Sequence, residues 1–160
     1  MGSRWLTQNE MNTAFTVFGH TIPYQKIYVT SALGIGNRPY TLPDATKWGY
    51  YAINIGSKVT WNTLIHELTH VWQGYNTPFA WDYVLNSVFS QALSSDAYAY
   101  KLGADWGDYN VEQQASIVED WFKRGRSSKD AAFHYIRDYV WKGISKIGYQ
   151  SNSDYDGILK

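Results

Sequence analysis

Residues 60–74 read TWNTLIHELTHVWQG, which is the clearest helical pattern in the chain. Its large apolar side chains recur at helical spacing, which indicates a helix with one buried face. Thr60 is a suitable N-cap, because its hydroxyl can accept a hydrogen bond from an amide of the first turn. Apolar pairs at 64–65 and 71–72 predict that most of this helix is buried.

Within this helix, residues 66–70 form the pattern HExxH. Residues four apart share a helix face, so the imidazoles of His66 and His70 can point at one spot. Neutral imidazole is a good zinc ligand, and Glu67 can act as general base on a zinc-bound water. Histidines that are only solvated are the alternative, but polar groups on a buried helix need partners. The pattern predicts a zinc site with His66 and His70 as ligands and Glu67 as the catalytic base.

The third ligand has to come from elsewhere, because hydrolytic zinc sites usually take three protein ligands and leave one position for water. The metzincin pattern needs a histidine six residues after His70, but Asn76 stands there. No histidine follows before His134. A carboxylate from a second helix is therefore the natural alternative.

The helix expected over residues 111–124 offers two carboxylates on one face, Glu112 and Glu119. Small residues share this face and would let the zinc helix come close. Glu112 lies in the first turn, where the helix dipole stabilises a carboxylate. The two glutamates are two turns apart, about 10 Å along the axis, so one ion cannot bind both. Glu112 is the predicted third ligand and Glu119 the second choice, with Asp96 and Asp105 as remaining alternatives.

The whole pattern predicts an α+β domain that is mainly helical, with a small sheet in its N-terminal half. Met1-Gly2-Ser3 resembles the remnant of an expression tag, so one domain is expected over residues 4–148, followed by a polar tail over 149–160. Helices are expected over 7–18 (capped by Thr7 with Glu10), 60–74, 78–93, 111–124 (capped by Asn110) and up to 141 (capped by Ser127 or Ser128), strands over 26–30 and 50–55, and loops over 32–47 and 94–110.

Composition excludes several classes of protein. The 160 residues carry a formal net charge of +0, which argues against binding nucleic acid or an anionic membrane through bulk charge. Cysteine is absent, so a disulfide framework and a thiol nucleophile are excluded. No stretch approaches the ~20 apolar residues that span a bilayer, and no signal peptide is recognisable. The aromatic share of 18% predicts rings in the core, with a ring-lined groove as the alternative.

The stretch LIHELTHVWQ, followed by NVEQQASIVEDW, resembles small bacterial gluzincin-type HExxH metallopeptidase domains, which are often attached to toxins or secretion-system proteins. AFTVFGHTIPYQKIYV resembles the lead-in that such domains carry. The resemblance spans residues 13–124. It implies a zincin-like fold, a Zn²⁺ cofactor held by His66, His70 and Glu112, and a peptide or protein substrate. It also implies a larger parent protein or a secretion-system partner, with secretion or delivery by such a system.

Two functions compete. In a zinc-dependent peptidase, Glu67 removes a proton from the zinc-bound water and passes it to the leaving amine. The alternative is a zinc-stabilised binding or structural module of a secreted, toxin-associated assembly without peptidase activity. Glu67 favours the enzyme, because a structural zinc site has no use for a general base. The aromatic content also allows a hydrolase of glycan-linked peptides. Candidates for stabilising an oxyanion are His134, Tyr135 and Tyr139.

Overall fold

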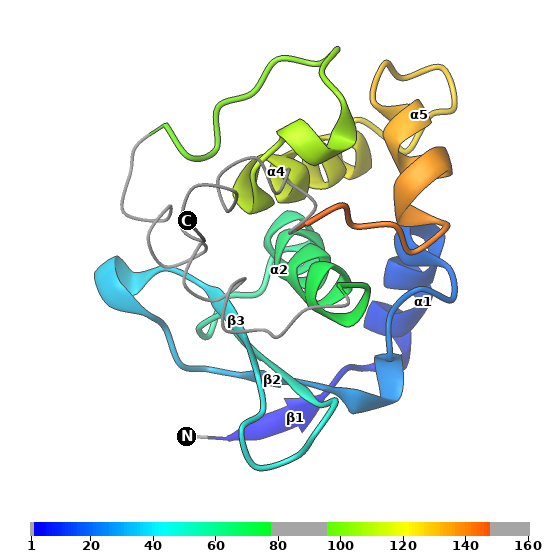
Figure 1. Ribbon diagram of the computed structural model, residues 1–160. Helices are drawn as coiled ribbons and strands as arrows, with labels where there is room; N and C mark the ends of the chain where they lie inside the picture. Colours follow the sequence, from blue (N-terminus) through cyan, green and yellow to red (C-terminus); the bar gives the residue numbers. More distant parts are fainter. Residues whose placement is uncertain (1, 78–95, 148–160) are drawn as a thin grey trace, which may run out of the picture.

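The computed structural model of the protein describes residues 2–77 and 96–147, which form an α+β arrangement (Figure 1). Helix α2 (Trp61–Tyr75) packs against a small sheet on one side and against helix α4 (Val111–Lys123) on the other. The expected α+β class is thus confirmed. The remaining helical segments are α1 (Gln8–Phe18), α5 (Phe133–Tyr135), the π-helical turn η4 (Ile136–Val140) and the 3-10 turns η1 (Tyr24–Lys26), η2 (Ile35–Asn37) and η3 (Trp106–Asp108).

The sheet is mixed. Its strand order is β1-β2-β4-β3. The central strands run parallel, with Val29 opposite Ile53, and each edge strand is antiparallel to its neighbour. Both of these central residues are buried, so this face of the sheet belongs to the core. The strands are β1 (Ser3–Trp5), β2 (Ile27–Thr30), β3 (Tyr40–Pro43) and β4 (Tyr51–Asn54).

The helix starts follow the expected caps. Thr7 caps α1 in a capping box with Glu10, and Thr60 accepts a hydrogen bond from the amide of Thr63. Asn110 caps α4 and forms a second capping box with Gln113. These side chains satisfy amides that have no partner inside the helix, which is why they fix the helix starts.

Helix α2 is buried along most of its length, as its sequence predicts. Leu64, Ile65, Leu68 and Val71 are at most 1% exposed. The indole of Trp72 is fully buried, and its N–H donates to the carbonyl of Val140 at 3.0 Å. Many aromatic rings thus belong to the core. Within the described ranges, no helix combines the length and the apolar character needed to cross a membrane.

Three parts of the chain differ from the expectation. Residues 40–43 pair with β4 as an edge strand, although they were expected in a loop; Pro43 is tolerated because it ends an edge strand. Strand β1 was not expected. The last helix begins at Phe133, not near Ser128, because Asp130 accepts from the amide of Ala132 and closes a turn there. The helix expected over 78–93 and the tail over 149–160 lie outside the described residues.

Candidate metal centre

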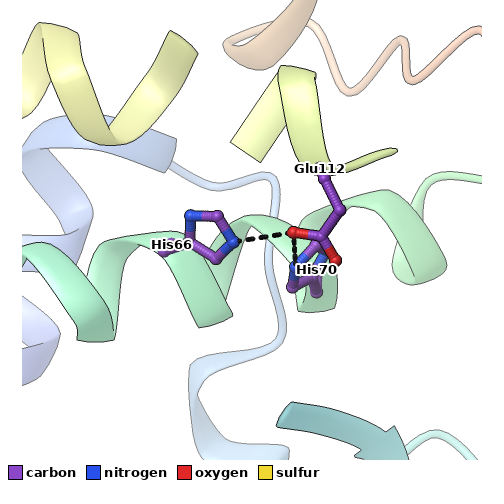
Figure 2. Close-up of side chains that lie close together, drawn as sticks. All are labelled: His66, His70 and Glu112. Atoms are coloured by element: carbon purple, nitrogen blue, oxygen red, sulfur yellow. Dashed lines mark hydrogen bonds and ion pairs between the residues drawn. The ribbon is translucent and has the colours of Figure 1, made fainter. Parts of the chain in front are cut away.

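Helices α2 and α4 bring together His66, His70 and Glu112, whose ligand atoms all lie within 4.8 Å of one another (Figure 2). Glu112 Oε2 lies 3.1 Å from His66 Nε2 and 3.5 Å from His70 Nε2. Figure 2 shows the carboxylate reaching from α4 to the two imidazoles on α2. The three residues expected as zinc ligands are therefore the three that the structure gathers at one point.

Local sequence explains this meeting. The four-residue spacing puts both imidazoles on the face of α2 that packs against α4. Asn110 starts α4 one residue before Val111, so Glu112 lies in the first turn. Ala115 follows on the same face and is fully buried, which allows a close approach of the two helices. Glu112 itself is only 3% exposed.

Glu119 takes a position that the sequence did not predict. Its Oε2 lies 2.9 Å from Nδ1 of His66, on the side of the ring opposite Glu112. Because Glu112 and Glu119 share a face of α4, both reach the same imidazole, through different ring nitrogens. Glu119 therefore acts on His66 as an orienting hydrogen-bond acceptor and is not in the three-residue cluster.

Gln73 orients the second histidine. Its Oε1 accepts from Nδ1 of His70 at 2.8 Å, while its Nε2 donates to the carbonyl of Val111 at 2.8 Å. The amide nitrogen must donate there, so the oxygen is the atom that faces His70. That requirement fixes the proton on Nδ1 and turns Nε2 of His70 toward Glu112.

Glu67 is 4% exposed, and a residue of the sheet donates a hydrogen bond to its carboxylate. Thr41 on β3 donates a hydrogen bond to Glu67 Oε2 at 2.8 Å. Burial raises the pKa of Glu67, although the charges of His70 and His66 oppose the rise. The carboxylate is therefore a stronger base than a solvated glutamate.

The electrostatics of the cluster favour a cation. Burial lowers the pKa of His66, but hydrogen bonds with Glu112 and Glu119 outweigh this and raise the pKa to about 10. Burial raises the pKa of Glu112, yet the charges of His70 and His66 bring that pKa below its ordinary value. The carboxylates thus favour positive charge at the imidazoles, which is the charge that a divalent ion supplies. Two imidazoles and a carboxylate are also a donor set that zinc prefers, so the residues fit this metal.

Tyr98 lies beside the cluster and was not singled out in the sequence. Its ring centroid is 6.0 Å from that of His66, and its hydroxyl shares a hydrogen bond with Arg38. Burial and the charge of Glu112 raise the pKa of Tyr98, so the hydroxyl keeps its proton. Nothing in the sequence distinguishes Tyr98 from the other tyrosines, because only the fold brings the turn at residues 96–98 next to α2.

The residues expected to stabilise an oxyanion lie elsewhere. His134 is exposed, and its Nδ1 contacts the carbonyl of Ala131 at 2.9 Å. Tyr135 is buried and donates to the carbonyl of Ala104, and Tyr139 stacks on a core tryptophan. These hydrogen bonds and packing contacts are structural. The other carboxylates weighed as ligands, Asp96 and Asp105, are exposed and are not in the cluster.

The chain is similar in sequence to a bacterial secretion-system spike protein and in fold to an effector domain. The curated relative is the type VI secretion system spike protein VgrG2b of Pseudomonas aeruginosa, 31% identical over 138 residues, which cover 74% of this chain. The match spans only 13% of that relative. Among solved structures, the effector domain of Pseudomonas aeruginosa VgrG2b matches with a TM-score of 0.60 and 26% identity, covering 88% of this chain and 84% of that one. No family model matches.

These matches correct the family expected from the sequence. Both relatives are VgrG2b proteins, described as a spike protein and as its effector domain, and neither is described as a gluzincin-type metallopeptidase domain. The assignment to that family is therefore wrong. The expected link with secretion-system proteins agrees with both matches.

Proposed function

We propose that this chain is a zinc-dependent hydrolase of peptide bonds that acts as an effector domain of a larger secreted assembly. The observation that carries the proposal is the buried cluster of His66, His70 and Glu112 with Glu67 next to it in α2. Glu67 is a buried carboxylate that lies beside the candidate ligands but is not one of them. Such a group can serve in acid–base chemistry, whereas a closed structural metal site does not need it.

The first part of the proposal concerns the metal. His66 and His70 would bind through Nε2 and Glu112 through a carboxylate oxygen, while Glu119 and Gln73 hold the far side of each imidazole. When bound, zinc supplies Lewis acidity that lowers the pKa of water and polarises a carbonyl. The orienting hydrogen bonds keep both imidazoles turned toward the same point, so little ordering remains to be done when the ion binds.

The second part concerns proton transfer. Glu67 accepts a proton from the attacking water and returns it to the leaving amine. Thr41 occupies Oε2, which leaves Oε1 as the carboxylate oxygen for this transfer. Burial of Glu67 raises its pKa and so brings its basicity closer to what transfer near neutral pH requires. Tyr98 and Arg38 would place hydrogen-bond donors where a negative charge develops on the substrate oxygen.

A second candidate function is a zinc-stabilised binding module without hydrolytic activity. The relatives favour it in one respect, since they are described as a spike protein and an effector domain and not as hydrolases. In either case we propose that the domain is carried by a larger spike protein and delivered by a secretion system. The similarity to a small part of a long spike protein supports this part of the proposal.

The test combines metal analysis with a search for cleavage. We expect elemental analysis to find stoichiometric zinc in the purified protein, and mass spectrometry to find cleavage products in a mixed peptide library. Glu67→Gln should keep the zinc and lose the cleavage, and the exposed Asp108→Asn, an equal change of charge, should keep both. Zinc with no cleavage by the parent protein would favour the binding module. Absence of zinc after metal loading would refute both functions.

A further inference from the structure

Residues of α1, of α4 and of the segments that follow α4 line a hollow that shares no residue with the metal centre. It measures about 520 Å³. Three rings contribute its apolar surface, Trp121, Phe133 and Trp141. Its polar border comes from the side chains of Thr16, Arg126 and Ser128, and Gly125 also lines it. We call this feature the aromatic hollow.

The three rings are held in fixed positions. Trp121 and Phe133 stack with centroids 6.2 Å apart, and Phe133 meets Trp141 edge to face at 5.5 Å. Each indole N–H is already used, by the carbonyl of Ser127 for Trp121 and by that of Val17 for Trp141, both at 3.0 Å. Trp141 is 45% exposed and Phe133 half-buried, so these two rings present apolar surface to the hollow, whereas Trp121 is buried. Neither indole keeps a free donor there.

Arg126 is a preorganised cation at the border. Its φ is +60°, a left-handed conformation that costs energy for a residue with a side chain. The conformation is held because its amide donates to the carbonyl of Trp121 at 3.0 Å and its guanidinium donates to the hydroxyl of Thr16. The guanidinium carbon lies 5.4 Å from the ring of Phe122. A charge fixed in this way loses little entropy when a ligand binds.

The chain concentrates positive charge around the aromatic hollow. Residues 123–129 read KRGRSSK, a run without a carboxylate in a protein of net charge +0. The nearby acids are engaged: Asp130 pairs with Arg124, and Asp120 accepts from Tyr100. In the part of the chain that the structure describes, the remaining cations of the run form no ion pair; these are Lys123, Arg126 and Lys129.

We propose that the aromatic hollow docks an acidic polypeptide segment of a partner protein, which places one large apolar side chain against the exposed surface of Phe133 and Trp141. The unpaired cations fit an acidic partner, and tryptophan with arginine is the composition of energetic centres in protein interfaces. A small molecule fits less well, because most lining residues are exposed and would leave it uncovered. The site does not depend on the proposed hydrolase function.

The indole N–H groups make the test direct. We would titrate the ¹⁵N-labelled protein with a synthetic peptide in which aspartates flank one phenylalanine. The indole signals of Trp121 and Trp141 should shift, with half-saturation below about 1 mM at low salt, and that of Trp5 on β1 should stay in place. Peptides with asparagine for aspartate, or alanine for phenylalanine, should bind at least about fivefold more weakly.

Two variants complete the experiment. Arg126→Gly removes the charge and suits the left-handed backbone, and Ser128→Asp places a negative charge in the lining; each should weaken peptide binding at least about fivefold. Lys58→Ala, an exposed lysine outside the hollow, should bind as the parent does. Equal binding by all variants, no shift at about 2 mM peptide, or shifts that appear on concentrating the protein alone would each overturn the proposal, the last in favour of self-association.

Discussion

Glu119 Oε2 and His66 Nδ1 lie 2.9 Å apart, so α4 contacts this imidazole of α2 on the side that faces away from Glu112. One helix face thus supplies both a candidate ligand and the group that orients another ligand. The two glutamates are seven residues apart on α4, and each contacts a different ring nitrogen of His66. Helix α4 therefore holds this imidazole from both sides.

The contacts of Glu112 and Glu119 with His66 predict unequal roles for the two glutamates in metal binding. Glu112→Ala removes a ligand and should weaken zinc binding about 100-fold or more, and Glu119→Gln, which only loosens His66, should weaken it about 10-fold. Competition with a fluorescent chelator measures both constants. Equal losses for the two variants would contradict the assignment of Glu112 as ligand and Glu119 as orienting residue.

The histidines should be individually indispensable for the metal. His66→Ala or His70→Ala leaves two protein ligands, too few for a tight hydrolytic zinc site, so zinc should fall well below stoichiometry. Elemental analysis after dialysis checks this. His134→Ala is the matched control, since His134 is exposed and lies outside the cluster, and it should retain zinc fully.

Thr41 predicts a link between the sheet and the base. Thr41→Val keeps the shape but removes the donor to Glu67 Oε2, which should lower the hydrolytic rate about tenfold while zinc content stays unchanged. Thr41→Ser restores a hydroxyl and should recover most of the rate. A valine variant as active as the parent would show that this hydrogen bond has no role in the chemistry.

Tyr98 should affect turnover more than binding. Tyr98→Phe removes the hydroxyl beside His66, and a donor that acts only on developing charge changes kcat and leaves KM nearly constant. The expected loss in kcat is about 10- to 100-fold. Tyr75→Phe, at the exposed end of α2, serves as control. A rise in KM at unchanged kcat would assign Tyr98 to substrate binding instead.

The capping box of α1 predicts a pH-dependent stability. Burial raises the pKa of Glu10, but hydrogen bonds from Arg4 and Thr7 outweigh this and lower the pKa. A lowered folded-state pKa means that the contribution to stability is present above the ordinary carboxyl pKa and is lost as the pH falls through the folded value. Glu10→Gln should therefore lower the Tm at pH 7 by about 2–6 °C, and the difference should vanish in strong acid. Thermal melts across pH measure it.

Much of this site could be predicted from the sequence, because it depends on local spacing. The separation of His66 and His70 on one helix and the cap at Asn110 before Glu112 are properties of short stretches. The start of α5 follows less regular rules. Asp130 competes for the amides that a longer helix would have used.

The partners of these residues could not be predicted, because they depend on long-range packing. Thr41 meets Glu67 only because residues 40–43 join the sheet as an edge strand, although the sequence had predicted a loop there. Gln73 and Tyr98 carry no distinguishing pattern of their own. Orientation of an imidazole from its far side is a tertiary relationship that a motif does not contain.

The hydrogen bond from Thr41 to Glu67 has a consequence for the chain before it folds. The residues of the candidate metal centre and their hydrogen-bond partners come from β3, α2 and α4, segments that meet only in the native structure. In an unfolded or partly folded chain the histidines are not surrounded by these carboxylates, so we expect no metal centre to form there. A cation that binds only the assembled centre would raise the free energy of unfolding by mass action, and so it would stabilise the fold that creates its own site.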